Sequence, residues 1–320
     1  MARSRSGSSA DLRSVRLITQ TDTQARLLLV SHHQVSKVPE QSLPTSRNIP
    51  RPVQREVRRR CGFGCVMCGM PLYEYEHLLG WANVQRHVAD EITLLCDQHH
   101  REKTAGLLPL EAVREANANP FNLRAGVSKP YDLHFSGDTC EAVLGSNTFT
   151  FRYDGMPTFT VPVCIDGVPL LAFVLDEGFL LLQLRLFDET NSPILQILNN
   201  QLIYSVSPWD IRLVGRNLVI RDAPRKFLVD ITFDVPNRIV INRGRFLLNG
   251  VEILLTPDYF LVVNNSTMMS QCHMENCRGG IIIGAQDMDG GTAFRIAGVP
   301  RYLGDRSAAI RWAEESLGNG

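Results

Sequence analysis

Two stretches, residues 61–77 (CGFGCVMCGMPLYEYEH) and residues 92–104 (ITLLCDQHHREKT), decide how the first part of this chain folds. The first contains Cys65 and Cys68, and the second contains Cys96 and His99, so each carries two metal-binding side chains separated by two residues. Two short chelating pairs of this spacing are typical of a tetrahedral structural zinc site, in which each pair binds along one edge of the tetrahedron. The sequence therefore predicts a structural Zn²⁺ held by these four side chains.

The other cysteines carry less information. Eight cysteines in 320 residues are far fewer than a disulfide scaffold contains. Those outside the two pairs are interpreted as small apolar residues. Cys272 and Cys277, with His273 between them, could form a second metal site, but they have no partner pair. The alternative for the first group is that its thiols are free and buried in a reducing compartment.

The charges balance overall and are unevenly distributed. The chain has 33 Lys plus Arg and 33 Asp plus Glu, which argues against a histone-like protein that coats nucleic acid. Residues 1–60 hold 12 basic and 4 acidic side chains, which leaves 21 and 29 for the rest. The basic residues are densest in RPVQREVRRR, residues 51–60, directly before the cysteines. This segment is expected either to contact phosphates or to be a solvated tail.

The composition, 44% apolar and 21% charged, is that of an ordinary globular protein rather than a disordered one. The most apolar stretch, residues 168–187, is interrupted by Asp176, Glu177 and Arg185, so a membrane-spanning helix is not expected. The first residues contain no apolar segment of the secretory type. We therefore expect a cytoplasmic protein with no membrane partner.

The pattern divides the chain into three regions. Residues 1–47 are expected to be a flexible basic segment, and residues 48–125 a compact domain that contains the metal ligands. In residues 126–320, short β-branched and aromatic runs alternate with turn signals such as Asn-Asn and Asn-Gly, which predicts an all-β domain with a short C-terminal helix. We expect an α+β protein whose second domain is sandwich-like, with a β-solenoid as the alternative.

A second group of polar residues lies within the cysteine-rich region. Glu76 and His77 are adjacent, and His100 directly follows His99. Neighbouring residues at the start of a helix point in different directions, so His99 can face zinc while His100 faces an open site. An acid and two imidazoles suit metal-assisted phosphodiester hydrolysis: a hard cation takes an oxygen ligand and an imidazole, and a separate neutral imidazole deprotonates water.

Residues 49–104 resemble the zinc-bearing HNH endonucleases: a basic helix runs into the first cysteine pair, an acid-His pair follows, and the segment ends in LC-x2-HH-x2-K. The resemblance covers residues 49–125 and implies a ββα-metal fold. It implies zinc on the four ligands named above, His77 as the general base, and Glu76 with His100 as ligands of a catalytic Mg²⁺ or Mn²⁺. The phosphate contacts that it implies are Arg58, Arg59, Arg60, Arg101 and Lys103.

One position departs from the family pattern. Glu91 stands where the family has the asparagine that orients the general base, and its carboxylate could accept a bond from the imidazole of His77. Asn83 and His87 are possible substitutes for this role. The resemblance thus implies a DNA endonuclease. We expect its β domain to regulate it through a protein partner, a ligand or self-assembly, as in some anti-phage systems. The alternative is a non-catalytic, zinc-stapled DNA- or protein-binding module with a self-assembly domain.

Overall fold

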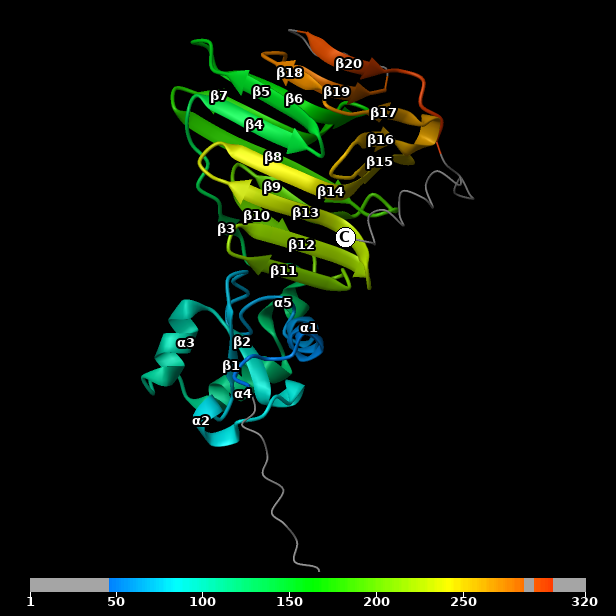
Figure 1. The fold of residues 1–320 in the computed structure, drawn as a ribbon. Helices are drawn as coiled ribbons and strands as arrows, with labels where there is room; N and C mark the ends of the chain where they lie inside the picture. The colour runs from blue at the N-terminus through cyan, green and yellow to red at the C-terminus, as the bar shows by residue number, and fades with distance from the viewer. Residues whose placement is uncertain (1–45, 285–290, 302–320) are drawn as a thin grey trace, which may run out of the picture. The chain divides into compact units, whose positions relative to one another are not determined.

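The computed structural model describes residues 46–284 and 291–301, which form a mixed α+β fold consisting mostly of strands (Figure 1). The expected C-terminal helix, and all but the last two residues of the expected flexible segment 1–47, lie outside these ranges. Within them, no helix is both long and apolar enough to cross a membrane.

Residues 46–130 contain the helices and one small sheet. The elements are α1 (Arg51–Arg60), β1 (Glu74–His77), α2 (Trp81–Val84), the 3-10 helix η1 (Ala89–Glu91), β2 (Ile92–Leu95), α3 (Asp97–Thr104), α4 (Leu110–Ala118) and α5 (Phe121–Ala125). The short strands β1 and β2 pair in antiparallel register, with His77 opposite Ile92. The helix α3 begins two residues after β2, so the order in this region is strand, strand, helix.

Local sequence explains these elements. Pro52 lies in the first turn of α1, where its missing N–H costs no hydrogen bond, and three arginines occupy the last turn, where they interact favourably with the helix dipole. Val57 of α1 packs with Ile92, Leu94 and other buried residues into a small apolar core. All four residues of β2 are buried, so this strand forms the centre of the region.

Residues 131–301 contain the remaining strands. They are β3 (Tyr131–Asp132), β4 (Thr139–Leu144), β5 (Asn147–Arg152), β6 (Thr158–Ile165), β7 (Val168–Asp176), β8 (Phe179–Phe187), β9 (Pro193–Leu198), β10 (Gln201–Tyr204), β11 (Asp210–Val214), β12 (Asn217–Ala223), β13 (Lys226–Asp234), β14 (Arg238–Leu248), β15 (Val251–Leu255), β16 (Phe260–Val262), β17 (Thr267–Met269), β18 (His273–Glu275), β19 (Gly279–Ile283) and β20 (Thr292–Ile296), with one 3-10 helix, η2 (Val263–Asn265).

The strands form two open sheets and no closed barrel among the described residues. One sheet has eight strands in the order β20-β19-β6-β7-β8-β9-β10-β3. The other has ten, with β11 to β17 side by side in sequence order and β4, β5 and β18 attached through β14. Most pairs are antiparallel, but β14 with β4, β18 with β5, and β19 with both β6 and β20 are parallel.

A shared apolar core lies between strands of both sheets. Leu171 of β7 and Leu184 of β8 belong to the same buried cluster as Ile231 of β13 and Ile253 of β15. In β8, buried and partly exposed residues alternate, as expected of a strand with one face in a core. The two sheets therefore share one apolar core, and the choice between a sandwich-like domain and a solenoid stays a prediction.

Two of the predicted turns form tight hairpins. Asn199 and Asn200 connect β9 and β10, and both have positive φ values, 50° and 69°. Asn249 and Gly250 do the same between β14 and β15, with φ values of 50° and 72°. Two-residue turns with positive φ at both positions match the twist of antiparallel strands, and asparagine and glycine tolerate that conformation best.

Candidate functional site

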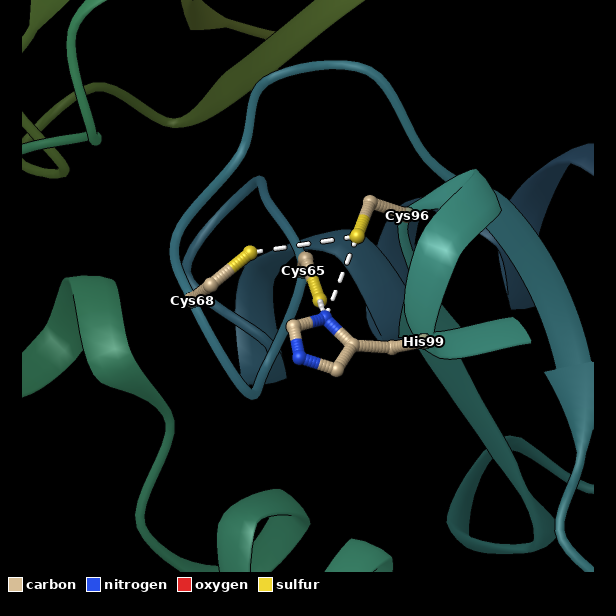
Figure 2. A group of neighbouring side chains, drawn as sticks. All are labelled: Cys65, Cys68, Cys96 and His99. Carbon is tan, nitrogen blue, oxygen red and sulfur yellow. Dashed lines mark hydrogen bonds between the residues drawn. The ribbon is translucent and has the colours of Figure 1, made fainter. Parts of the chain in front are cut away.

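Cys65, Cys68, Cys96 and His99 converge on one point, as Figure 2 shows. Their ligand atoms all lie within 4.8 Å of one another. The Sγ atoms of Cys68 and Cys96 are 3.8 Å apart, and Nδ1 of His99 is 3.1 Å from Sγ of Cys96 and 3.4 Å from Sγ of Cys65. This confirms the prediction that the two short pairs come together in a group that could hold zinc.

The donor chemistry and spacing fit a tetrahedral ion. With a Zn–S bond of about 2.3 Å and a Zn–N bond of about 2.05 Å, the ligand atoms of a tetrahedral site lie roughly 3.5–3.8 Å apart. The three distances given above, 3.1 to 3.8 Å, are close to that range. Three thiolates and one imidazole are a common structural zinc set, and they leave no open position for substrate. These four residues therefore fit a structural ion rather than a catalytic one.

The loop that carries the first pair is tightly packed. Gly69 donates its N–H to the carbonyl of Cys65, at 2.7 Å, and has a positive φ of 77°. A Cβ at Gly69 would lie 2.3 Å from Oδ1 of Asn122, whose buried side chain donates to the carbonyl of Gly62. Only glycine combines this backbone conformation with so close an approach. Residues of α5 therefore hold the loop in place.

The two thiols of the first pair influence each other. The hydrogen bond with Cys65 lowers the pKa of Cys68 to about 5, and the same interaction raises the pKa of Cys65. Without a metal ion, the pair therefore favours a state with one thiolate and one thiol. A thiolate is the form that binds zinc, so this environment prepares one ligand for the ion.

A second polar group lies on the other side of α3. Nε2 of His100 is 3.0 Å from Oε2 of Glu76, and Nζ of Lys103 is 2.5 Å from Oε1 of the same carboxylate. Nδ1 of His100 also lies 3.5 Å from a carboxylate oxygen of Glu74. Thus His99 faces the thiolates while its neighbour His100 faces Glu76. Glu74 is not among the residues that the sequence analysis named, and the structure places it beside His100.

His77 is buried at the end of β1, with 6% of its surface exposed. Nε2 of His77 lies 3.3 Å from Nδ1 of His87, and Nε2 of His87 lies 2.8 Å from the carbonyl oxygen of Ser46. The ring of Trp81 stacks on His87 with centroids 4.8 Å apart, and it lies 5.1 Å from the ring of His77. Burial, reinforced by the neighbouring His87, lowers the pKa of His77. The shift favours the neutral form of its imidazole.

Glu91, which we expected to orient His77, has another partner. Nε of Arg86 donates to Oε2 of Glu91 at 2.9 Å, and a second bond joins Nη2 to Oε1. This hydrogen bond with Arg86 lowers the pKa of Glu91. The backbone carbonyl of Glu91 accepts from the N–H of Leu78. Of the three residues considered for orienting the base, His87 is the one that the structure places in hydrogen-bonding distance of His77.

The five expected phosphate contacts lie in different environments. Arg59 and Arg101 are exposed, and Arg101 pairs with Asp97 on the same helix at 2.6 Å. Arg60 is partly buried and donates to the carbonyls of Ala89 and Ile92. Lys103 belongs to the group around Glu76.

Arg58 differs from these because its side chain is only 6% exposed and is bound on both sides. Nε and Nη2 of Arg58 donate to the two carboxylate oxygens of Asp210 at 2.9 and 2.7 Å, and Nη1 donates to the hydroxyl of Tyr75 at 2.7 Å. The expectation that Arg58 contacts phosphate does not agree with this burial, since a guanidinium with these partners is not accessible. Sequence reasoning missed Asp210 and Tyr75, and no spacing signal connects them to Arg58.

Glu76 and His100 are the two residues expected to hold a catalytic divalent ion. A carboxylate oxygen and an imidazole nitrogen 3.0 Å apart can share one ion. Mg²⁺ usually takes few protein ligands and fills its other positions with water and phosphate oxygens, so two ligands are compatible with it. In the parts of the chain that the structure describes, the cysteine-histidine group is the one set of three or more such donors that converges, and Cys272, His273 and Cys277 form no comparable set.

No family model, curated protein or solved structure matches this chain. The functional interpretation therefore depends on the geometry of the site and on the resemblance carried by its motifs.

Proposed function

We propose that this chain is a metal-dependent endonuclease of the zinc-bearing HNH type, which hydrolyses phosphodiester bonds in DNA. The observation that carries the proposal is the grouping of His77, Glu76 and His100. The buried imidazole of His77 and the carboxylate of Glu76 lie at the end of β1. The imidazole of His100, which pairs with Glu76, lies in the first turn of α3. The strand-strand-helix order of β1, β2 and α3 agrees with the ββα-metal fold implied by the resemblance.

In this proposal His77 acts as the general base. Its lowered pKa keeps the imidazole unprotonated near pH 7, so a ring nitrogen can accept a proton from the attacking water. Burial against Trp81 limits the positions that the ring can adopt. A base held in one orientation adjacent to the carboxylate of Glu76 would meet the water on one side of the scissile phosphate.

Glu76 and His100 would hold the Mg²⁺ or Mn²⁺ ion. The ion would polarise the phosphate and stabilise the charge on the leaving oxygen. Lys103 now pairs with Glu76 at 2.5 Å, so its ammonium group keeps the carboxylate in place and lies where a phosphate would approach. Arg59 and Arg101 are exposed and would bind the DNA backbone that flanks the cleaved bond, whereas Arg58 would have a structural role.

The β domain would regulate this activity through a protein partner, a ligand or self-assembly. Support comes from the contacts that join it to the nuclease region: Asp210 of β11 binds Arg58, and the hydroxyl of Tyr204 donates to the carbonyl of Phe63 at 2.6 Å. A rearrangement of these strands would be transmitted to α1. A role in anti-phage defence and a cytoplasmic location stay predictions from the sequence.

The decisive experiment is plasmid cleavage by the full chain in Mg²⁺ or Mn²⁺. We expect nicking or degradation of supercoiled DNA, which His77→Ala should abolish. His134→Ala is the matched control, since His134 is an exposed histidine outside this group. Cleavage that persists in His77→Ala would refute the assignment of the base.

A specific observation favours the alternative of a non-catalytic binding module. The carboxylate of Glu76 already has a cationic partner in Lys103, and no third carboxylate or imidazole among the described residues completes a metal set there. If the chain binds DNA or protein but cleaves nothing with any divalent ion, this alternative is favoured over the nuclease.

A further inference from the structure

His77, His87 and Ser46 form a continuous row of polar atoms. The row runs from Nε2 of His77 to Nδ1 of His87 at 3.3 Å, and from Nε2 of His87 to the carbonyl oxygen of Ser46 at 2.8 Å. The three residues come from β1, from the segment after α2 and from the chain before α1. Their meeting is thus a property of the tertiary structure, since from the sequence His87 was one of two possible substitutes for Glu91.

The carbonyl oxygen of Ser46, at the end of the row, determines which ring nitrogens of the two histidines carry a hydrogen. A carbonyl oxygen can only accept, so Nε2 of His87 must carry a hydrogen. A neutral His87 then has its lone pair on Nδ1, which can only accept. In the pair with His87, Nε2 of His77 must therefore be the donor, which leaves the lone pair of a neutral His77 ring on Nδ1. A backbone hydrogen bond with Arg86 also acts on the pKa of His77, so the backbone of Arg86 is a second partner of this ring.

The indole of Trp81 holds this row in place. Its ring lies nearly parallel to that of His87, at 17°, and is tilted by 56° relative to that of His77. A ring in a stacked position loses much of its rotational freedom, so Nδ1 of His87 stays directed at His77. Glu91, by contrast, is bound to Arg86 through both oxygens.

We propose that His87 is the positioning residue of the general base: it fixes His77 as the Nε2–H tautomer and so leaves Nδ1 of His77 to take the proton of the attacking water. The inference rests on the proposed endonuclease function. In the step itself, an O–H bond of water breaks and its proton forms a bond with Nδ1 of His77. The water oxygen bonds to phosphorus, and the leaving oxygen departs with its electron pair. The hydrogen on Nε2 stays in place, and its bond to His87 strengthens as the ring becomes positive.

Two substitutions of His87 test its two contributions separately, namely the acceptor atom Nδ1 and the ring that stacks on Trp81. His87→Phe keeps a ring that can stack on Trp81 but removes the acceptor. His87→Asn loses the stacking ring but places an amide oxygen near the former position of Nδ1, where it can accept from His77. The matched control is His134→Phe, which makes the same substitution at an exposed histidine outside this group. Zinc content and thermal unfolding are measured for all variants to confirm that they fold.

The first readout is cleavage kinetics. We expect His87→Phe to lower kcat by about 10- to 100-fold, a part of what general-base catalysis contributes, with less change in KM for DNA. His87→Asn should recover most of this loss, and His134→Phe should cleave like the unmodified chain. Equal kcat for His87→Phe and the unmodified chain would overturn the inference while leaving the endonuclease function intact. If the unmodified chain does not cleave, the proposed function fails, and the catalytic role of His87 fails with it.

The second readout does not need cleavage. In full-length, zinc-loaded protein with ¹⁵N-labelled histidine rings, the NMR spectrum at one fixed pH distinguishes the two neutral tautomers. We expect Nε2–H for His77 in the unmodified chain and in His87→Asn, and a mixture in His87→Phe. An Nδ1–H tautomer of His77 in the unmodified chain, or no change in His87→Phe, would overturn the assignment.

Discussion

Arg58 and Asp210 form a bidentate ion pair between residues 152 positions apart in the sequence, and the two side chains are only 6% and 8% exposed. The pair joins α1 to β11. Arg58 also donates to the hydroxyl of Tyr75, which lies next to Glu76 in β1. The guanidinium of Arg58 therefore connects the β strands with the strand that carries the proposed nuclease residues.

Removing one member of this pair should be costly. Asp210→Ala leaves the charge of Arg58 buried without its partner, and we expect a loss of about 3–5 kcal/mol in the free energy of unfolding. Urea unfolding measures it. The control is Glu111→Ala, which breaks the exposed pair with Arg114 and should cost about 0.5 kcal/mol or less. Equal losses in the two variants would show that burial does not set the strength of the pair.

We expect the group of Cys65, Cys68, Cys96 and His99 to bind one zinc ion per chain, and the fold around it to depend on that ion. Cys68→Ser should abolish zinc binding and unfold the region around β1, β2 and α3, because ion binding supplies part of the folding free energy of such a region. Metal analysis and hydrogen exchange measure the two effects. Cys272→Ser, outside the group, should retain the ion. Protein purified without added chelator that contains no zinc would contradict the assignment.

Gly69 and Gly106 offer a matched test of loop packing. Their φ values are similar, 77° and 74°, but a Cβ at Gly69 would overlap Asn122, whereas nothing lies within 4 Å of one at Gly106. Gly106→Ala should cost about 1–2 kcal/mol in unfolding free energy, the usual strain of a left-handed residue. Gly69→Ala should cost more and speed the transfer of zinc to a chelator. Similar zinc release from both variants would mean that backbone strain alone matters.

Each exposed arginine of the proposed nuclease region is expected to contribute about one phosphate contact to DNA binding. Arg59→Ala and Arg101→Ala should each weaken binding at low salt and reduce the salt-dependence slope by about 1, as expected when one phosphate contact is lost. Fluorescence anisotropy over a series of salt concentrations measures this. Arg152→Ala removes an exposed arginine of β5 and should leave the slope unchanged. A reduced slope for Arg152→Ala as well would show that binding is spread over the whole surface.

The sequence predicted those parts of the protein whose cause is local. The group that could hold zinc was predicted from its two chelating pairs, because the two ligands of each pair are only three positions apart and their geometry depends on a short piece of backbone. The strands followed from alternation, as in β8, and the hairpins from Asn199-Asn200 and Asn249-Gly250, whose side chains tolerate positive φ. The opposite directions of His99 and His100 followed from the rotation between neighbouring residues of a helix.

The partners of His77 and Arg58 could not be read from spacing. The family pattern pointed to Glu91 as the orienting residue and left Asn83 and His87 as possible substitutes. Glu91 is paired with Arg86, and His87 is the residue that lies beside His77. Basic clustering suggested that Arg58 was exposed, but it is buried because Asp210 and Tyr75 satisfy its donors.

By itself, then, the sequence indicated the group that could hold zinc and the mainly β character, and it named the ionisable residues of the proposed site. The tertiary structure alone decided which of those residues are buried, which imidazole touches which, and that the two sheets share one core. The physical reason is that metal chelation, helix rotation and strand alternation act over a few residues. Desolvation and hydrogen-bond satisfaction instead depend on segments that meet only when the whole chain has folded.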